Sequence, residues 1–139
     1  MCADHLEDDL RTQLFGPNPV ANTVIAYADD EPAGFALYFF NFSTFLARPG
    51  LYLEDLYVKP ALRKRGIGRA LLAYLARVAS ERGCGRMEWS VLNWNEMALR
   101  VYRGIGAQPL EDWTVMRLTG PAISALAATA PAAPRSSAT

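Results

Sequence analysis

The sequence predicts one α/β domain, on three observations. Segments in which apolar residues alternate or run together predict strands at residues 20–27, 35–42, 51–58 and 87–91. Apolar residues at helical spacing predict helices, of which residues 67–79 form the clearest. The chain has 139 residues, 51% of them hydrophobic, and can bury roughly two thirds of its unfolded surface in a single core.

The chain begins with a predicted surface helix at residues 2–15. Leucines recur there at positions 6, 10 and 14 among acidic residues, so one stripe of the helix is apolar. Asp4 is a candidate N-cap, and the Gly16-Pro17 pair would end the helix. We therefore expect a short helix that buries this single stripe.

Two strands joined by an acidic turn are predicted next. Residues 20–27 alternate enough for a strand, and Asp-Asp-Glu-Pro followed by Gly34 predicts the hairpin turn into the second strand. The second strand, residues 35–42, is a continuous aromatic and aliphatic run bounded by turn signals. Such a run is typical of a central strand covered on both faces.

The strand at residues 51–58 carries a break in its apolar phase. Its leucines occupy odd positions before the adjacent acids Glu54 and Asp55, and its aliphatic residues occupy even positions after them. Because side chains alternate between the two faces of a strand, this slip would turn some of them outward. A β-bulge at Glu54-Asp55 would restore a common face. A regular strand whose tyrosines fill both faces explains the pattern equally well.

The second half of the chain predicts two helices and two short strands. The helix at residues 67–79 should end at Gly83, and residues 87–91 alternate as a strand. A second helix should start from a cap within residues 93–95 and end at Gly106. Its side chains predicted to face inward are Met97, Ala98, Val101, Tyr102 and Ile105. The alternating residues 113–118 predict a last strand.

Composition excludes several classes of function. The formal net charge is zero, and no apolar run approaches the ~20 residues that cross a bilayer, so we expect no nucleic-acid or membrane partner. Two cysteines without metal or redox spacing, and no signal-peptide pattern, favour free thiols, no metal site and a cytoplasmic location. Residues 1–120 should form the domain. Residues 121–139 are rich in Ala and Pro and should form a tail, disordered from about residue 127.

The basic turn before the clearest helix is a candidate anion site. Its glycines are Gly66 and Gly68, and its cations are Arg63, Lys64, Arg65 and Arg69. Backbone N–H groups in a turn and at a helix N-terminus bind phosphate, and the cations would add full charges. The spacing excludes a dinucleotide-binding turn and a P-loop, because position 71 is Leu and no Gly-Lys-Ser or Gly-Lys-Thr follows. A solvated surface turn is the alternative interpretation.

These residues also carry a resemblance to a known family. Arg63-x-x-Gly66-x-Gly68, between a strand and an amphipathic helix, resembles the acetyl-coenzyme A pyrophosphate loop of the GNAT (GCN5-related N-acetyltransferase) superfamily. Residues 52–58, the Trp-Asn-Glu segment 94–96, and Tyr-Arg ahead of Gly-Ala at 102–107 are similar to its diamine and polyamine (spermidine/spermine) branch. The likeness covers about residues 4–118.

The resemblance implies a fold and a coenzyme site. The fold would be a mixed, mostly antiparallel sheet with a β-bulge, flanked by helices, in which the bulged strand splays from a parallel neighbour at residues 87–92. Pantetheine would enter this gap and pair with the strand backbone as an added strand does. The implied acetyl-CoA-binding residues are Leu56, Val58, Arg63, Lys64, Arg65, Gly66, Gly68, Arg69 and Asn95.

The resemblance also implies a mechanism, which is direct transfer in a ternary complex. A primary ammonium with a pKa near 10.4 is mostly protonated at neutral pH, so the amine needs a base, and Glu54 matches the family's candidate. The N–H of Leu56 would face the oxyanion. Tyr102 matches the general acid that protonates the leaving thiolate. Helical spacing alone would instead make Tyr102 a core residue.

The implied acceptor is a small primary amine, such as a di- or polyamine or a lysine analogue. Glu54 and Asp55 would attract it and Trp94 could pack on its methylene chain, although Trp94 fits the core better. Acetylation of a protein or peptide, or a non-catalytic acyl-CoA-binding module, are the alternatives. The superfamily usually dimerises. Its first strand and helix have no room here, so we expect an incomplete acceptor side, from a misassigned start or a truncation.

Overall fold

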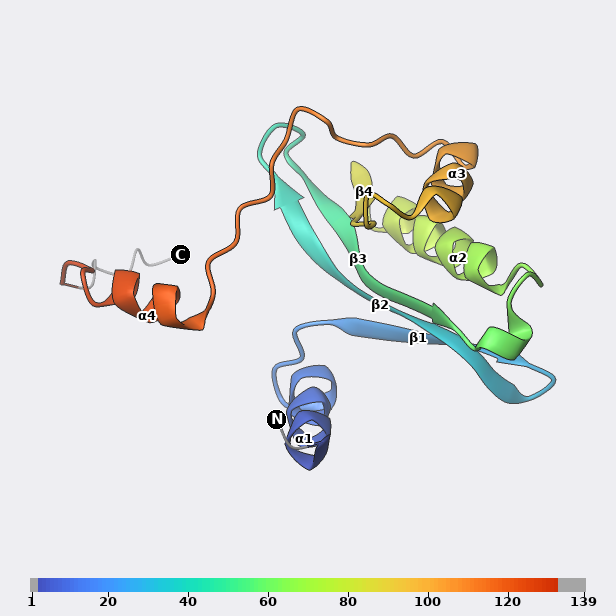
Figure 1. Cartoon of the computed structure of the whole chain (residues 1–139), viewed down its shortest axis with the longest axis horizontal. Helices are drawn as coiled ribbons and strands as arrows, with labels where there is room; N and C mark the ends of the chain where they lie inside the picture. The colour runs from blue at the N-terminus through green and yellow to red at the C-terminus, as the bar shows by residue number, and fades with distance from the viewer. Residues whose placement is uncertain (1–2, 133–139) are drawn as a thin grey trace. The chain divides into compact units, whose positions relative to one another are not determined.

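The computed structural model describes residues 3–132 and contains helices, strands and one 3₁₀ turn (Figure 1). Their bounds are α1 Ala3–Phe15, β1 Asn22–Ala28, β2 Glu31–Ser43, β3 Arg48–Val58, η1 Pro60–Leu62, α2 Ile67–Glu81, β4 Arg86–Trp89, α3 Glu96–Gly104 and α4 Gly120–Ala127. These elements form two compact units, of which the first ends at Trp94 and the second begins at Asn95.

The first unit is built on a four-stranded sheet in the order β1-β2-β3-β4. β1 and β2 pair antiparallel, as do β2 and β3, whereas β3 and β4 pair parallel. The predicted mixed, mostly antiparallel sheet is therefore confirmed. The predicted hairpin turn is tight, because Asp29 and Asp30 take φ values of 51° and 67°. Positive φ at both central residues matches the right-handed twist of the strands on either side.

The predicted β-bulge in β3 is present, and it lies at Glu54. Leu37 of β2 pairs with Asp55 and the next residue, Tyr38, pairs with Leu53, so Glu54 has no partner across the ladder. The extra residue returns Leu56, which pairs with Ala36, to the face of the sheet that carries Leu53. The alternative of a regular strand is therefore wrong.

The core lies between α2 and one face of the sheet. The residues buried there are Ala33, Ala36, Tyr38, Leu51, Leu53, Leu71, Leu72, Leu75 and Ala79. The stripe of α2 recurs every three or four residues, as the sequence predicts. At the end of α2 the N–H of Gly83 bonds to Ser80 and that of Cys84 to Ala79, while Gly83 takes a φ of 70°. This Schellman motif explains why the helix ends just before Gly83, as the sequence predicts.

The opposite face of the sheet is not covered as the sequence predicts. The side chains of Phe35 and Phe39 on this face of β2 are only half-buried. They pack instead against tyrosines of β3, with ring centroids 5.8 Å apart for Phe35–Tyr57 and 5.2 Å apart for Phe39–Tyr52. The prediction of a strand covered on both faces is wrong, because aromatic pairs across neighbouring strands can shield one another without a second layer.

The helix α1 also departs from its prediction. Leu6 and Leu10 are 49% and 48% exposed, so the apolar stripe is largely uncovered, and only Leu14 is half-buried. Asp4 lies within the helix, which is described from Ala3, and therefore not at the N-cap. The spacing correctly predicts a helix, but burial depends on a neighbouring element that periodicity does not describe.

The second unit contains α3, an irregular connection and α4. The predicted strand at residues 113–118 is absent. A strand needs a partner for its backbone, and the described part of this unit holds helices and irregular chain alone. α4 was not predicted, although Pro121 in its first turn and its alanines favour a helix. Residues 133–139 of the predicted disordered tail lie outside the described residues.

The buried Tyr38 makes the stability of the first unit sensitive to high pH. Burial raises the pKa of its phenol above the ordinary 10.0, the Tyr74 phenol adds to the rise, and Arg82 opposes it. The unfolded chain therefore loses this proton first, and the free energy of unfolding falls as the pH rises through about 10. Tyr38→Phe should flatten this fall in urea unfolding between pH 9 and pH 11. Tyr27→Phe, at an exposed site, should not; equal slopes for both variants would contradict the prediction.

Candidate functional site

The bulge in β3 coincides with the end of the parallel pairing between β3 and β4. The paired residues run from Gly50 and Arg86 to Leu53 and Trp89. Beyond Leu53, β3 continues to Val58, but among the described strands it pairs there only with β2. The other edge of residues 54–58 therefore has no strand partner. An extended ligand could use such an edge as an added strand would, and the predicted residues Leu56 and Val58 lie on it.

Two carboxylates follow directly after the point on β3 where its pairing with β4 ends. Glu54 is the bulged residue and Asp55 follows it, and both are exposed. Within residues 3–132, neither of them forms an ion pair. Two adjacent, uncompensated negative charges attract a cation, and a carboxylate at this position can accept a proton from an ammonium.

The basic loop leads from the end of β3 into α2. Lys64 and Gly66 both take positive φ, of 66° and 81°, and Gly66 is the N-cap of α2 without a side-chain cap. The first N–H groups of a helix have no carbonyl partner within it, and they carry the positive end of its dipole. A Cβ at Gly66 would meet nothing within 4 Å, so the backbone conformation and not space favours glycine there.

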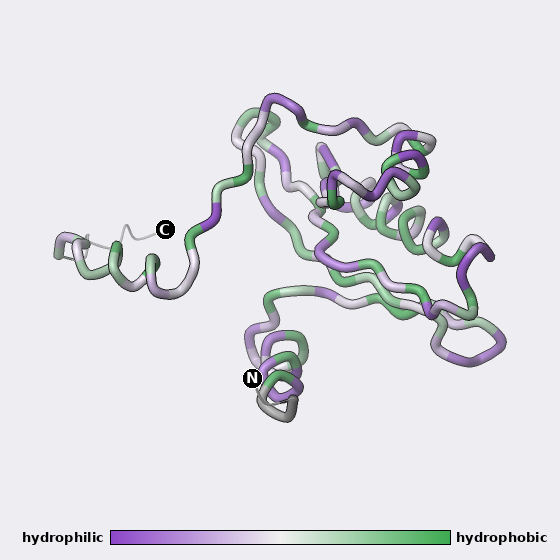
Figure 2. Tube along the Cα trace, viewed as in Figure 1, coloured by the Kyte–Doolittle hydropathy of each residue, from purple (hydrophilic) through white to green (hydrophobic). Residues whose placement is uncertain are grey.

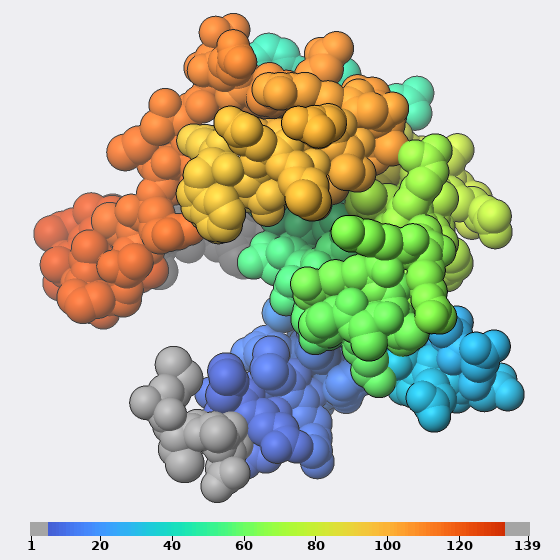
Figure 3. All heavy atoms as spheres, turned by 45° about the vertical axis from the view of Figure 1, so that its right-hand side comes forward, coloured from blue at the N-terminus to red at the C-terminus, as the bar shows by residue number. Residues whose placement is uncertain are grey.

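The loop cations surround this helix terminus on the surface. All four predicted cations, Arg63, Lys64, Arg65 and Arg69, are exposed, and none forms an ion pair within the described chain. Figure 2 shows the loop between β3 and α2 as a hydrophilic segment, and Figure 3 shows the same segment in green at the surface. Gly68, the second residue of α2, is half-buried beside the side chain of Val58, so the start of this helix lies next to the end of β3.

Arg63 makes a contact that the sequence does not reveal. Its Nε donates a hydrogen bond to the carbonyl oxygen of Val58 at 3.0 Å, and its guanidinium lies 5.9 Å from the ring centroid of Tyr57. Arg63 thereby ties the loop to the strand end while its terminal nitrogens remain exposed. A guanidinium offers five donors, so one bond to a carbonyl leaves others for an anion.

The second unit holds two further residues predicted for the site, Asn95 and Tyr102. Asn95 is the N-cap of α3, and its Oδ1 accepts a hydrogen bond from the N–H of Ala98 at 3.2 Å. Tyr102 is half-buried, and its carbonyl accepts from the N–H groups of Ile105 and Ala107 in a Schellman motif at Gly106. The predicted helix, its cap and its stop are confirmed.

The inward face of α3 differs from its prediction. Met97, Val101 and Ile105 are 75%, 54% and 37% exposed, whereas Ala98 and Tyr102 are half-buried. The prediction is thus wrong for three residues, because a unit with so few elements cannot cover every apolar position. Trp94 is 74% exposed, so its interpretation as a core residue is wrong as well.

Two substitutions of Asn95 separate its cap from any other role. Asn95→Ala removes the acceptor for the Ala98 N–H and should destabilise α3 by about 1 kcal/mol, whereas Asn95→Asp keeps the cap oxygen. We expect circular dichroism to show lost helicity and a lower melting temperature for the alanine variant only. Equal melting temperatures for the two variants would show that the cap hydrogen bond is not the reason why position 95 is an asparagine.

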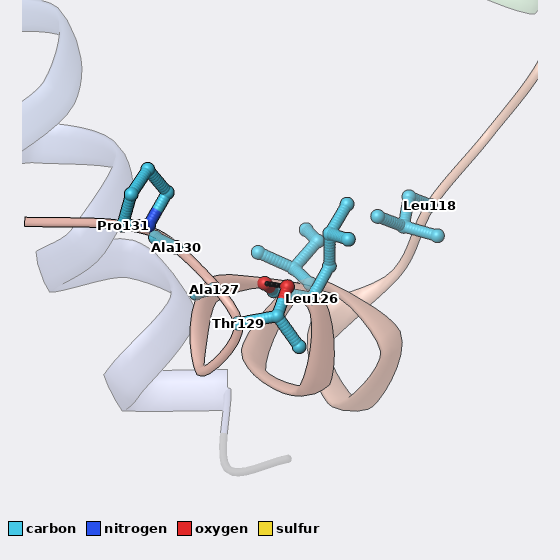
Figure 4. A pocket seen from close by; sticks show the side chains of 7 residues that line it. Leu118, Leu126, Ala127, Thr129, Ala130 and Pro131 are labelled. Atoms are coloured by element: carbon cyan, nitrogen blue, oxygen red, sulfur yellow. Dashed lines mark hydrogen bonds between the residues drawn. The ribbon is translucent and has the colours of Figure 1, made fainter.

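A pocket outside these residues lacks groups for catalysis. It is an apolar hollow of about 460 Å³ in the second unit, lined by Leu118, Ile123, Leu126, Ala127, Thr129, Ala130 and Pro131 (Figure 4). Its one hydroxyl, on Thr129, donates to the carbonyl of Leu126 at 2.7 Å. Within residues 3–132, no cluster of three His, Cys, Asp or Glu could hold a metal ion, and no helix is long and apolar enough to cross a bilayer.

Comparisons with known proteins agree with this geometry. Two curated relatives are an L-ornithine N5-acetyltransferase of Arabidopsis thaliana, 37% identical over 119 residues, and a thialysine N-epsilon-acetyltransferase of Bos taurus, 39% identical over 132 residues. The alignments cover 86% and 87% of this chain. They span 49% of the Arabidopsis protein and 77% of the bovine protein.

Solved structures share the fold. An integron cassette protein from the mobile metagenome of V. cholerae matches with a TM-score of 0.81 and 28% identity, covering 91% of this chain and 78% of its own. An aminoglycoside N-acetyltransferase in complex with CoA matches with a TM-score of 0.63 and 26% identity, covering 86% and 97%. The model of the acetyltransferase (GNAT) family matches residues 2–107. The chain therefore belongs to the GNAT family of acetyltransferases.

Proposed function

We propose that the chain is an N-acetyltransferase that transfers the acetyl group of acetyl-CoA to a primary amine of a small molecule. One observation carries the proposal: the first unit joins an unpaired strand edge, two uncompensated carboxylates and a basic helix N-terminus within residues 54–69. These are the groups needed to hold an extended thioester, an ammonium and a pyrophosphate. Family membership and a relative solved with CoA support the use of an acyl-CoA.

The residues of the first unit fit the coenzyme. The exposed cations Arg63, Lys64, Arg65 and Arg69, together with the N–H groups at the start of α2, would bind the pyrophosphate. The backbone of Leu56 and Val58 would pair with pantetheine on the side opposite β2. The carbonyl of Val58 already accepts a hydrogen bond from Arg63. The N–H of Val58 and the backbone N–H and carbonyl of Leu56 are therefore the groups left to pair with pantetheine. When bound, the coenzyme supplies an activated thioester.

The proposed mechanism assigns one step to each polar group. Glu54 takes a proton from the ammonium, directly or through water, so that the amine can attack the thioester carbonyl. The N–H of Leu56 stabilises the oxyanion that forms. As the carbon–sulfur bond breaks, Tyr102 gives a proton to the leaving thiolate, and the new amide nitrogen returns its extra proton to the Tyr102 phenolate, directly or through water. Asn95 contributes to the coenzyme site from the start of α3. No acyl-enzyme is formed.

The acceptor we propose is a di- or polyamine or a lysine analogue. Similar proteins include an ornithine and a thialysine acetyltransferase and a spermidine/spermine N1-acetyltransferase-like protein. Glu54 and Asp55 would attract the positive charges of such acceptors, and the exposed Trp94 could pack on their methylene groups. A protein or peptide amine is the second candidate, and the exposure of both carboxylates allows it.

A thiol-release assay with acetyl-CoA tests the function and the acceptor together. The panel contains putrescine, spermidine, ornithine, thialysine, an aminoglycoside and a peptide with a free N-terminus. We expect turnover with the diamines and amino-acid amines and little with the peptide. Preference for the peptide would identify a protein acetyltransferase. Coenzyme binding by calorimetry without thiol release from any acceptor would identify a non-catalytic acyl-CoA-binding module and refute the proposal.

We further propose that the chain acts in the cytoplasm as a homodimer. Apolar residues that stay exposed in the described chain, among them Leu6 and Leu10 of α1, support a covering partner. Sedimentation equilibrium gives the mass of the particle in solution, and a monomer at micromolar concentration would refute the dimer. A fluorescent fusion tests the location.

A further inference from the structure

A side-chain hydrogen bond links β3 to the chain that leaves β4. The hydroxyl of Tyr52 and Oγ of Ser90 lie 2.9 Å apart. Tyr52 pairs with Glu88 in the parallel ladder, and Ser90 follows Glu88 by two residues. Because side chains alternate along extended chain, Tyr52 can reach Ser90 along the same face of the sheet.

This bond lies where the pairing between β3 and β4 ends, a point we call the apex. The gap is the space beyond the apex, beside the unpaired edge of residues 54–58 of β3. The last ladder pair is Leu53 with Trp89, and Ser90 is the first residue beyond it. On β3, the bulged Glu54 follows directly after the same pair. The distance between the two chains at the start of the gap therefore depends on where Ser90 is held.

The strand β4 is short. The strand has four residues, Arg86–Trp89, and a parallel ladder of that length is weak. Tyr52 itself is well positioned, because its ring packs on Phe39 with centroids 5.2 Å apart. The Tyr52 hydroxyl is therefore held in place on the sheet, and its hydrogen bond to Ser90 positions the start of residues 90–94.

We propose that Tyr52 and Ser90 form a positioning pair that sets the width of the gap at its apex, and through it the length of the acyl group that the site accepts. The proposal rests on the proposed function, since it concerns the thioester end of an acyl-CoA beside Glu54. A narrow apex holds an acetyl group against the bulge and leaves little room for further methylenes. With the pair removed, residues after Trp89 can move away, which disfavours acetyl and admits longer acyl groups.

The test compares acyl donors across matched variants of the full chain. In Tyr52→Phe and Ser90→Ala, the ratio of kcat/KM for propionyl-CoA over acetyl-CoA should rise about 2- to 12-fold, which is the range for one neutral hydrogen bond. The double variant should match the single variants, because both changes break the same bond. Ser90→Thr keeps the hydroxyl and should restore the original ratio. Tyr27→Phe, which removes an exposed phenol from β1, should leave the ratio unchanged.

A second readout does not need any coenzyme. Amide hydrogen exchange of residues 90–94 should be faster in Tyr52→Phe and Ser90→Ala than in the unmodified chain, and unchanged in Tyr27→Phe. Faster exchange with unchanged donor ratios would overturn the role in acyl selection, as would additive effects in the double variant. No thiol release from the unmodified chain would refute the proposed function and the selectivity with it. In that case, exchange would still show whether the pair holds the apex.

Discussion

Replacing Tyr102 with Phe is expected to lower turnover by about 10²- to 10⁴-fold in a thiol-release assay, the range for loss of a general acid. The leaving thiolate would have to take its proton from water. Coenzyme affinity should stay nearly the same, because the proposed coenzyme contacts lie in residues 54–69 and at Asn95. Calorimetry with acetyl-CoA measures that affinity separately from turnover.

The substitution is conservative for the structure of α3. The end of the helix depends on the Tyr102 carbonyl, which accepts the N–H groups of Ile105 and Ala107, and Phe keeps that carbonyl and the ring. Tyr74→Phe is the control, because it removes an exposed phenol from α2, a helix outside the proposed acid–base chemistry. Unchanged turnover in Tyr102→Phe would remove this residue from the mechanism. An equal loss in both variants would indicate a general effect on folding.

The β-bulge shows why part of the fold could be predicted from sequence. Side chains alternate strictly along a strand, so a one-residue slip in the apolar phase has few physical solutions. The slip at Glu54 and Asp55 leaves two solutions, which are a β-bulge and a regular strand with tyrosines on both faces. The pairing of β3 with β2 shows the bulge. Helix stops at Gly83 and Gly106 were predictable for a similar reason, because the positive φ that ends each helix is a local property.

Burial was less predictable, because it depends on which element lies opposite. The exposed stripe of α1 and the exposed Met97 and Val101 of α3 have the spacing of buried residues. The absent strand at residues 113–118 has the alternation of a real one, without a strand to pair with. In each of these segments the spacing follows from the local sequence, whereas burial or strand pairing depends on a tertiary neighbour that the spacing does not specify.

The candidate site also has a part that the sequence predicts and a part that it does not. Its strand edge and basic loop are contiguous in sequence, so residues 54–69 could be assigned together from the order strand, turn and helix. The hydrogen bonds from Arg63 to Val58 and between Tyr52 and Ser90 were not predictable. Each depends on where a side-chain tip lies in space, and many residues could have supplied the partner.

The basic loop allows a second test with a large expected effect. Arg63→Ala combined with Arg65→Ala should weaken acetyl-CoA binding about 100-fold, since it removes two charge-assisted contacts worth roughly 1.5 kcal/mol each. The affinity of the unmodified chain should fall as salt rises, because the Debye length shrinks from about 10 Å at 0.1 M to about 3 Å at 1 M. The double variant should show a shallower salt dependence. Calorimetry at several salt concentrations measures both.

The two single variants should differ, although each removes one positive charge. Arg65→Ala removes an exposed cation that forms no ion pair in the described chain, so its loss should shrink at high salt. Arg63→Ala also removes the 3.0 Å hydrogen bond to Val58, which ties the loop to β3, and part of its loss should persist at 1 M salt. Arg77→Ala is the matched control, because it removes an exposed charge from the C-terminal half of α2, away from its N-terminus. If Arg77→Ala weakened binding as much as Arg65→Ala, net charge and not the loop would bind the coenzyme. If Arg63→Ala lost all of its effect at high salt, the bond to Val58 would have no part in shaping the site.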